Sequence, residues 1–135
     1  MQTIWITGGS SGIGFAVAKK FLEENWRVII SSRNEEKLNK AVKKLKKQTS
    51  NKEIFYKTCD VSKYNDVKDT VAYIETDISK IDIALLNAAA YSPNRTQEFD
   101  IENYNLLIEV NLNGTINCID AVSYTHLTLP TILLV

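Results

Sequence analysis

The residues best suited to chemistry near the N-terminus form a glycine-rich turn. Residues 7–14 read TGGSSGIG and lie between an apolar, β-branched run and an amphipathic run. Glycine lets the backbone turn sharply and approach an anion without a Cβ clash, and the free N–H groups of a following helix attract phosphate. No Gly-Lys-Ser/Thr follows, which disfavours a nucleoside-triphosphatase loop. The turn predicts nucleotide binding, with an ordinary strand-to-helix turn as the alternative.

The elements that must position this turn alternate along the first 90 residues. Short apolar runs predict strands at residues 2–7, 26–32, 53–59 and 81–86, and the last of these is nearly all-apolar, as in a strand buried on both faces. Runs at helical spacing, such as residues 35–47, separate the strands. Strands that alternate with helices imply a parallel sheet. We therefore expect an α/β fold, a Rossmann-like doubly wound parallel sheet that ends after about four strands.

A last helix is expected at residues 101–121. Its apolar positions form one stripe that also includes Asn111; they are Tyr104, Leu107, Ile108, Leu112 and Ile116. A polar residue on a buried helical face needs a hydrogen-bond partner, so Asn111 is a candidate functional residue.

Residues 122–135 break the helical pattern. The segment 122–131, VSYTHLTLPT, resembles one reading frame of the transposon adapter used in sequencing-library preparation. We expect residues 1–121 to form the domain and residues 122–135 to be a non-native tail. The alternative is a genuine strand at the apolar run TILLV.

Composition excludes several classes of protein. The 135 residues include 16 Lys+Arg and 16 Asp+Glu, so no net charge draws the chain to nucleic acid or an anionic membrane. No apolar run reaches 18 residues, and no signal peptide is visible. Cys59 and Cys118 lack zinc-ligand spacing and His126 is the one histidine, so no metal site is expected. We expect a cytoplasmic domain with neither a nucleic-acid nor a membrane partner.

Four motifs in order resemble the short-chain dehydrogenase/reductase family over about residues 2–121. They are Thr7-Gly8-x-x-x-Gly12-x-Gly14, Cys59-Asp60-Val61, Asn87-Ala88-Ala89 and Asn111-x-x-Gly114. The family usually shows Asn-Asn-Ala-Gly at the third motif, where this chain has Leu86-Asn87-Ala88-Ala89. The resemblance implies a dinucleotide-binding domain.

The resemblance also implies roles for individual residues. The pyrophosphate and its neighbourhood would be lined by Gly8, Ser10, Ser11, Gly12, Ile13 and Gly14. Asp60 would accept a hydrogen bond from the adenine amine and Val61 would pack on the ring, the alternative being a turn or N-cap aspartate. Asn87, with Ala88 and Ala89, would brace the end of the fourth strand and contact the cofactor ribose. Asn111 would hold a water in the catalytic proton relay; its alternative is an asparagine bonded only to backbone.

The end of the second strand decides the cofactor. An acid there binds the ribose 2′-hydroxyl, but residues 31–34 read SSRN, with Ser32 at the usual Asp position. Arg33 can fork onto a phosphate, which favours NADP over NAD. The alternative is a solvated arginine that opens the next helix.

The activity implied is hydride transfer between nicotinamide and a small carbonyl or alcohol substrate. The family's catalytic serine, tyrosine and lysine follow its fifth strand, beyond the last residue of this chain. Tyr124 is followed four residues later by Thr128, not Lys, and Tyr91 and Tyr104 also lack a lysine partner. We therefore expect this chain to be the inactive N-terminal fragment of an oxidoreductase that forms homo-oligomers. The alternative is a dinucleotide sensor without turnover.

Overall fold

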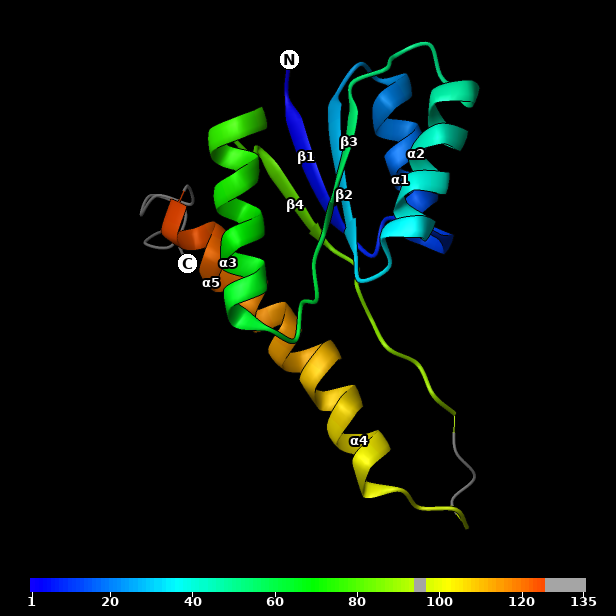
Figure 1. Ribbon diagram of the computed structural model, residues 1–135, viewed down its shortest axis with the longest axis vertical. Helices are drawn as coiled ribbons and strands as arrows, with labels where there is room; N and C mark the ends of the chain where they lie inside the picture. Colours follow the sequence, from blue (N-terminus) through cyan, green and yellow to red (C-terminus); the bar gives the residue numbers. More distant parts are fainter. Residues whose placement is uncertain (94–96, 126–135) are drawn as a thin grey trace.

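Four parallel strands form one sheet at the centre of the molecule (Figure 1). The computed structural model describes residues 1–93 and 97–125. Its elements in chain order are β1 (Thr3–Thr7), α1 (Gly12–Glu23), β2 (Arg27–Ser32), α2 (Glu35–Gln48), β3 (Ile54–Thr58), α3 (Tyr64–Tyr73), a π-helical turn (Ile74–Ile78), β4 (Ile83–Leu86), α4 (Ile101–Ile108), a second π-helical turn (Glu109–Asn113) and α5 (Gly114–Thr125). Each predicted strand is present, with ends shifted by up to two residues.

The sheet has the order β3-β2-β1-β4. Thr7 at the end of β1 pairs with Ser31 of β2 on one side and with Leu86 of β4 on the other. Ser32 of β2 pairs in turn with Thr58 at the end of β3. The carboxyl ends of all four strands therefore lie together, and the loops that leave them can share one site.

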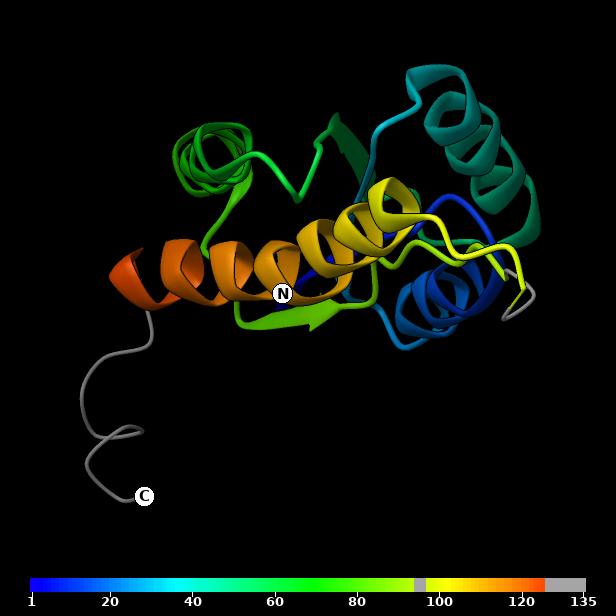
Figure 2. The ribbon, with the colours of Figure 1, turned by 90° about the horizontal axis from the view of Figure 1, so that it is seen from below.

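Helices cover both faces of the sheet, with α1 and α2 on one side and α3 and α5 on the other (Figures 1 and 2). Side chains alternate along β1 to serve both layers, because successive residues of a strand point to opposite faces. Ile4 and Ile6 pack with the apolar side of α1 and α2, whereas Trp5 packs with α3 and α5. The predicted Rossmann-like α/β fold is confirmed.

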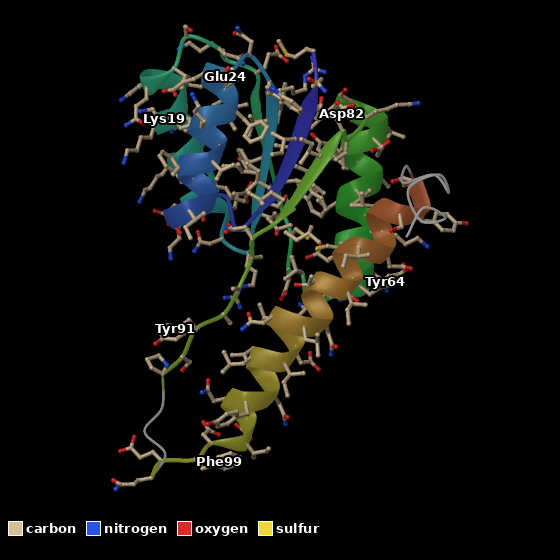
Figure 3. All side chains as sticks on the ribbon, turned by 180° about the vertical axis from the view of Figure 1, so that it is seen from behind. Lys19, Glu24, Tyr64, Asp82, Tyr91 and Phe99 are labelled. Carbon is tan, nitrogen blue, oxygen red and sulfur yellow. The ribbon has the colours of Figure 1, made fainter. Side chains whose placement is uncertain are left out.

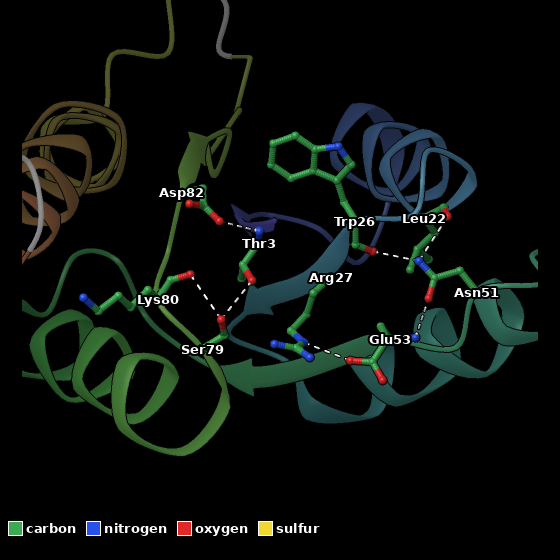
Figure 4. A network of polar contacts seen from close by, with 9 residues as sticks. All are labelled: Thr3, Leu22, Trp26, Arg27, Asn51, Glu53, Ser79, Lys80 and Asp82. Atoms are coloured by element: carbon green, nitrogen blue, oxygen red, sulfur yellow. Dashed lines mark hydrogen bonds and ion pairs between the residues drawn. The ribbon is translucent and has the colours of Figure 1, made fainter. Parts of the chain in front are cut away.

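Polar bonds tie the amino ends of the strands together (Figure 4). The Thr3 backbone N–H donates to Asp82 Oδ2 at 2.7 Å, and Arg27 Nε donates to Glu53 Oε2 at 2.9 Å. Asn51 Nδ2 donates to the Trp26 carbonyl at 2.8 Å. Structural contacts therefore occupy the amino ends of the strands. The carboxyl ends, on the opposite side of the molecule, remain for a ligand.

β4 lies at the edge of the sheet, as expected for a sheet that ends after about four strands. Two predictions about burial are wrong. Ile83 is exposed and its three neighbours in β4 are only half-buried, whereas the apolar run predicted a strand buried on both faces. α4 extends away from the sheet (Figure 1), and the stripe that includes Asn111 is largely exposed, with Ile108 at 51% and Leu112 at 57%. The stripe has the period of a buried helix, but the described chain supplies no layer to cover it.

The end of the last helix also differs from the prediction. α5 continues through residues 122–125, and Val122 is buried in the core. Residues 126–135 of the predicted non-native tail lie outside the described residues, and the origin of the tail stays a prediction. Of the helices in the described ranges, none has the length and apolar character needed to span a membrane.

Candidate functional site

The glycine-rich turn crosses the carboxyl end of the sheet from β1 toward β2. Gly8 has a φ of 68°, a left-handed conformation that side chains disfavour, and its N–H donates to the Ser31 carbonyl at 2.7 Å. Gly9 donates to the same carbonyl at 3.2 Å. These two bonds hold the turn against the end of β2.

The start of α1 is open to a ligand. Gly12 has a φ of 56°, and a Cβ at this position would meet nothing within 4 Å. Ser11 is the N-cap residue, but its side chain does not cap the helix. The first N–H groups of α1 therefore have no side-chain acceptor in the described part of the chain, as expected at a helix end that receives a phosphate.

The loop after β4 braces the turn from the other side. Thr7 Oγ1 accepts hydrogen bonds from the N–H groups of Asn87 at 3.0 Å and Ala88 at 3.1 Å. Asn87 Nδ2 donates to the Gly8 carbonyl at 3.2 Å. The bracing by Asn87 expected from the family resemblance is therefore present in the geometry, although its side chain is occupied by the turn.

The loop after β3 is held in place by α5. Asp60 Oδ1 accepts from the backbone N–H and the hydroxyl of Ser62 at 3.0 and 2.7 Å, so Asp60 makes the turn that was its alternative role. The Val61 carbonyl accepts from Asn117 Nδ2 at 2.9 Å. A Cβ on Gly114 would lie 2.7 Å from Val61 Cγ2, so this glycine lets α5 approach the loop.

These loops enclose a cavity of about 580 Å³ at the carboxyl ends of the strands. Its lining includes Gly8, Ser10, Ser11, Ser31, Ser32, Arg33, Asn34, Lys37, Cys59, Asp60, Val61, Ala88, Ala89 and Val110. Nine predicted site residues are in this set, and it adds Ser31, Asn34, Lys37, Cys59 and Val110. The volume lies within the roughly 300–1,000 Å³ typical of small-molecule sites. The glycine turn and the open helix start fit a dinucleotide.

Five predicted site residues lie outside that lining. Gly12 lines an adjoining cavity of about 450 Å³, and Ile13 is 74% exposed at the helix start. Gly14 and Asn87 support the turn from beneath, since a Cβ on Gly14 would lie 2.7 Å from Asn87 Nδ2. Asn111, the fifth, lies in the second π-helical turn, next to Val110, which does line the cavity.

Asn111 lies in the second π-helical turn and holds the segment after β4. Its Oδ1 accepts from the Ala90 N–H at 2.7 Å and its Nδ2 donates to the Ala90 carbonyl at 2.9 Å. Asn111 is exposed, so the expectation of a buried asparagine is wrong. Both of its hydrogen bonds go to backbone, which was the alternative role. π-Helical turns are frequent at functional sites because they change the direction of side chains.

Arg33 follows β2 at the mouth of the cavity, next to the start of α2. Asn34 is the N-cap of α2, and its Oδ1 accepts from the Lys37 N–H at 2.9 Å. This cap fixes the first turn of the helix and brings Lys37 to the cavity. The sequence shows Lys37 only as one of many lysines on a charged helix, so its place in the site could not be inferred.

Tyr64 and Lys68 at the start of α3 also have the Tyr-x-x-x-Lys spacing of the family's catalytic pair, which the sequence interpretation above did not include. Tyr64 faces α5 (Figure 3), and its hydroxyl donates to Asp120 Oδ2 at 2.6 Å. This hydrogen bond raises the pKa of Tyr64, whereas a tyrosine that acts as a base needs a lowered pKa. Tyr64 and Lys68 line a separate cavity between α3 and α5, so they do not serve the dinucleotide site.

The two cysteines belong to the core behind the site. Burial raises the pKa of the Cys59 thiol to about 11 and that of Cys118 to about 12. Both thiols are therefore protonated at neutral pH and act as small apolar groups. Among the described residues, no group of three or more His, Cys, Asp or Glu side chains could hold a metal ion.

Comparison with known proteins assigns the class of this fold and site. The family model for short chain dehydrogenases matches residues 2–127. The chain therefore belongs to the short-chain dehydrogenase family.

Two curated relatives illustrate the range of the family. Chlorophyll(ide) b reductase NOL of Arabidopsis thaliana, a chloroplastic protein, is 35% identical over 117 residues, which cover 85% of this chain and 33% of the relative. Glucose 1-dehydrogenase of Gluconobacter oxydans is 33% identical over 124 residues, covering 91% of this chain and 46% of the relative. The chain thus spans between a third and a half of these relatives.

Solved structures agree with the fold. Actinorhodin polyketide ketoreductase, crystallised with NADPH, superposes with a TM-score of 0.83 at 28% identity, over 90% of this chain and 46% of that protein. An alcohol dehydrogenase from Thermococcus sibiricus, complexed with 5-hydroxy-NADP, gives a TM-score of 0.84 at 28% identity, over 93% of this chain and 53% of that protein.

Proposed function

We propose that this chain is the dinucleotide-binding part of an NADP-dependent oxidoreductase that moves a hydride between nicotinamide and a small carbonyl or alcohol substrate. The cavity at the carboxyl ends of the strands carries this proposal, because the glycine turn and Arg33 both line it. Two structural neighbours are described with NADPH or an NADP derivative, which supports the same cofactor class. When bound, the dinucleotide supplies the site that accepts or donates the hydride.

The residues of this chain would bind and orient the cofactor. The N–H groups at the start of α1 would receive the pyrophosphate, with Gly8, Ser10, Ser11, Gly12, Ile13 and Gly14 around it. Asp60 and Val61 would hold the adenine, while Asn87, Ala88 and Ala89 would support the ribose. Ser32 and Arg33 would receive the 2′-phosphate, because a guanidinium can donate two parallel hydrogen bonds to it.

Asn111 would act on the catalytic side of the site. It ties the segment after β4 to the π-helical turn through the Ala90 backbone, which supports a role for Asn111 in positioning the catalytic proton relay. We expect this chain alone to bind dinucleotide without turnover. We further propose that the active protein is a cytoplasmic homo-oligomer, for which the exposed apolar stripe of α4 and α5 gives the supporting observation.

Titration of the chain with NADP and NAD by calorimetry, repeated on Arg33→Ala, tests the cofactor assignment. We expect NADP to bind more tightly than NAD, and Arg33→Ala to weaken NADP selectively. Equal loss of affinity for the two cofactors would overturn the assignment of NADP.

A further inference from the structure

We propose that Lys37 is a second determinant of NADP specificity, acting with Arg33 on the ribose 2′-phosphate; this inference rests on the proposed function. Lys37 lines the 580 Å³ cavity together with Ser32, Arg33 and Asn34. It also lines the adjoining 450 Å³ cavity with Ser10 and Ser11 of the glycine turn. Lys37 thus lies where the two cavities meet.

The backbone directs Lys37 toward that junction. The bond from the Lys37 N–H to Asn34 Oδ1 caps α2 at 2.9 Å, which fixes the first turn of the helix beside the end of β2. Arg33 and Lys37 stand on either side of the capping residue Asn34 in the sequence, and both line the cavity. A phosphate between them would receive a forked donor from Arg33 and a point charge from Lys37.

The surrounding charges leave both cations available. In the described ranges, neither Arg33 nor Lys37 forms an ion pair, whereas the neighbouring Lys40 pairs with Glu36 at 2.8 Å. Glu35 and Glu36 line neither cavity. Asp60 is the carboxylate in the lining, and its Oδ1 is occupied by Ser62. The lining therefore has a net positive charge, which would increase its affinity for a ligand that carries a dianionic phosphate.

Two nucleotide fragments isolate this interaction. Adenosine 2′,5′-bisphosphate carries the 2′-phosphate and 5′-AMP lacks it, so the ratio of their affinities measures recognition of that group alone. We expect Lys37→Gln to weaken binding of the bisphosphate about fivefold, the size of a favourable exposed ion pair, and to leave 5′-AMP nearly unchanged. Lys37→Arg should retain the preference. The matched control is Lys43→Gln, an exposed lysine of the same helix that lines neither cavity and should change neither affinity.

The outcomes separate the two proposals. If the unmutated chain prefers the bisphosphate and Lys37→Gln leaves both affinities unchanged or weakens both equally, only the role of Lys37 is overturned. If the unmutated chain binds neither fragment, the proposed function is overturned as well. A measurement on the unmutated chain guards against a folding defect: adenosine 2′,5′-bisphosphate, but not 5′-AMP, should protect Lys37 from amine acylation detected by mass spectrometry. Equal protection by both would also refute the inference.

Discussion

Gly14 is the position where one added methyl group tests the architecture of the site. A Cβ there would overlap the Gly8 carbonyl oxygen and lie 2.7 Å from Asn87 Nδ2. The oxygen belongs to the backbone of the turn, so no side-chain rotation relieves the overlap. Gly14→Ala therefore forces α1 away from the sheet or displaces the turn.

Two opposing effects set the size of the change. Alanine in place of glycine stabilises a helix by about 1 kcal/mol. Overpacking a filled site costs about 1–3 kcal/mol, and a backbone contact belongs at the upper end of that range. We expect a net loss of about 1–2 kcal/mol in the free energy of unfolding, with weaker NADP binding because the first N–H groups of α1 would move.

Urea unfolding followed by circular dichroism measures this loss, and calorimetry measures the binding. The matched control is Ala16→Gly, at an exposed position of the same helix, which should lose about 1 kcal/mol from helix propensity alone. If Gly14→Ala were instead more stable than the parent chain, the close packing of α1 on the turn would be refuted.

Three further predictions follow from contacts around the site. Raising the pH above about 9 should lower the free energy of unfolding by at most about 1.4 kcal/mol per pH unit for each buried thiol. The reason is that cysteine in the unfolded chain ionises in this range, whereas folded Cys118 stays protonated up to a pKa of about 12. A Cys118→Ala variant whose stability falls equally steeply with pH would contradict this. Asn111→Ala should speed amide exchange at Ala90 about two- to tenfold, since both hydrogen bonds between these residues are lost, and unchanged exchange would show that these bonds do not hold the segment. Tyr64→Phe should lower the melting temperature slightly and leave NADP affinity unchanged; a large fall in affinity would connect the Tyr64–Lys68 pair to the dinucleotide site.

Local patterns predicted the sheet and the turn because both depend on short-range physics. The β-branched run before Gly8 favours a strand, and the positive φ angles of Gly8 and Gly12 favour glycine at these two positions. The roles of Asp60 and Asn87 at the ends of the third and fourth strands came instead from the family resemblance, because an apolar run before a polar residue does not by itself indicate a ligand.

Contacts over long distances could not be inferred in this way. Whether the stripe of Leu112 and Ile108 is covered depends on which other layers the chain builds, and helical period alone does not report it. The role of Lys37 depends on how the start of α2 meets the glycine turn. The π-helical turn around Asn111 has no signature in the apolar spacing, so a continuous α-helix was the natural prediction for residues 101–121.

That wide turn at Glu109–Asn113 joins two strand ends through one piece of helix. In the middle of this turn Asn111 holds Ala90 beyond β4, and just after the turn Gly114 leaves room for Val61 beyond β3. Removing a single residue between these two contacts would rotate α5 by about 100° relative to Asn111, so that one of the anchors must fail. The number of residues between Asn111 and Gly114 is thus fixed by the two strand ends that they contact.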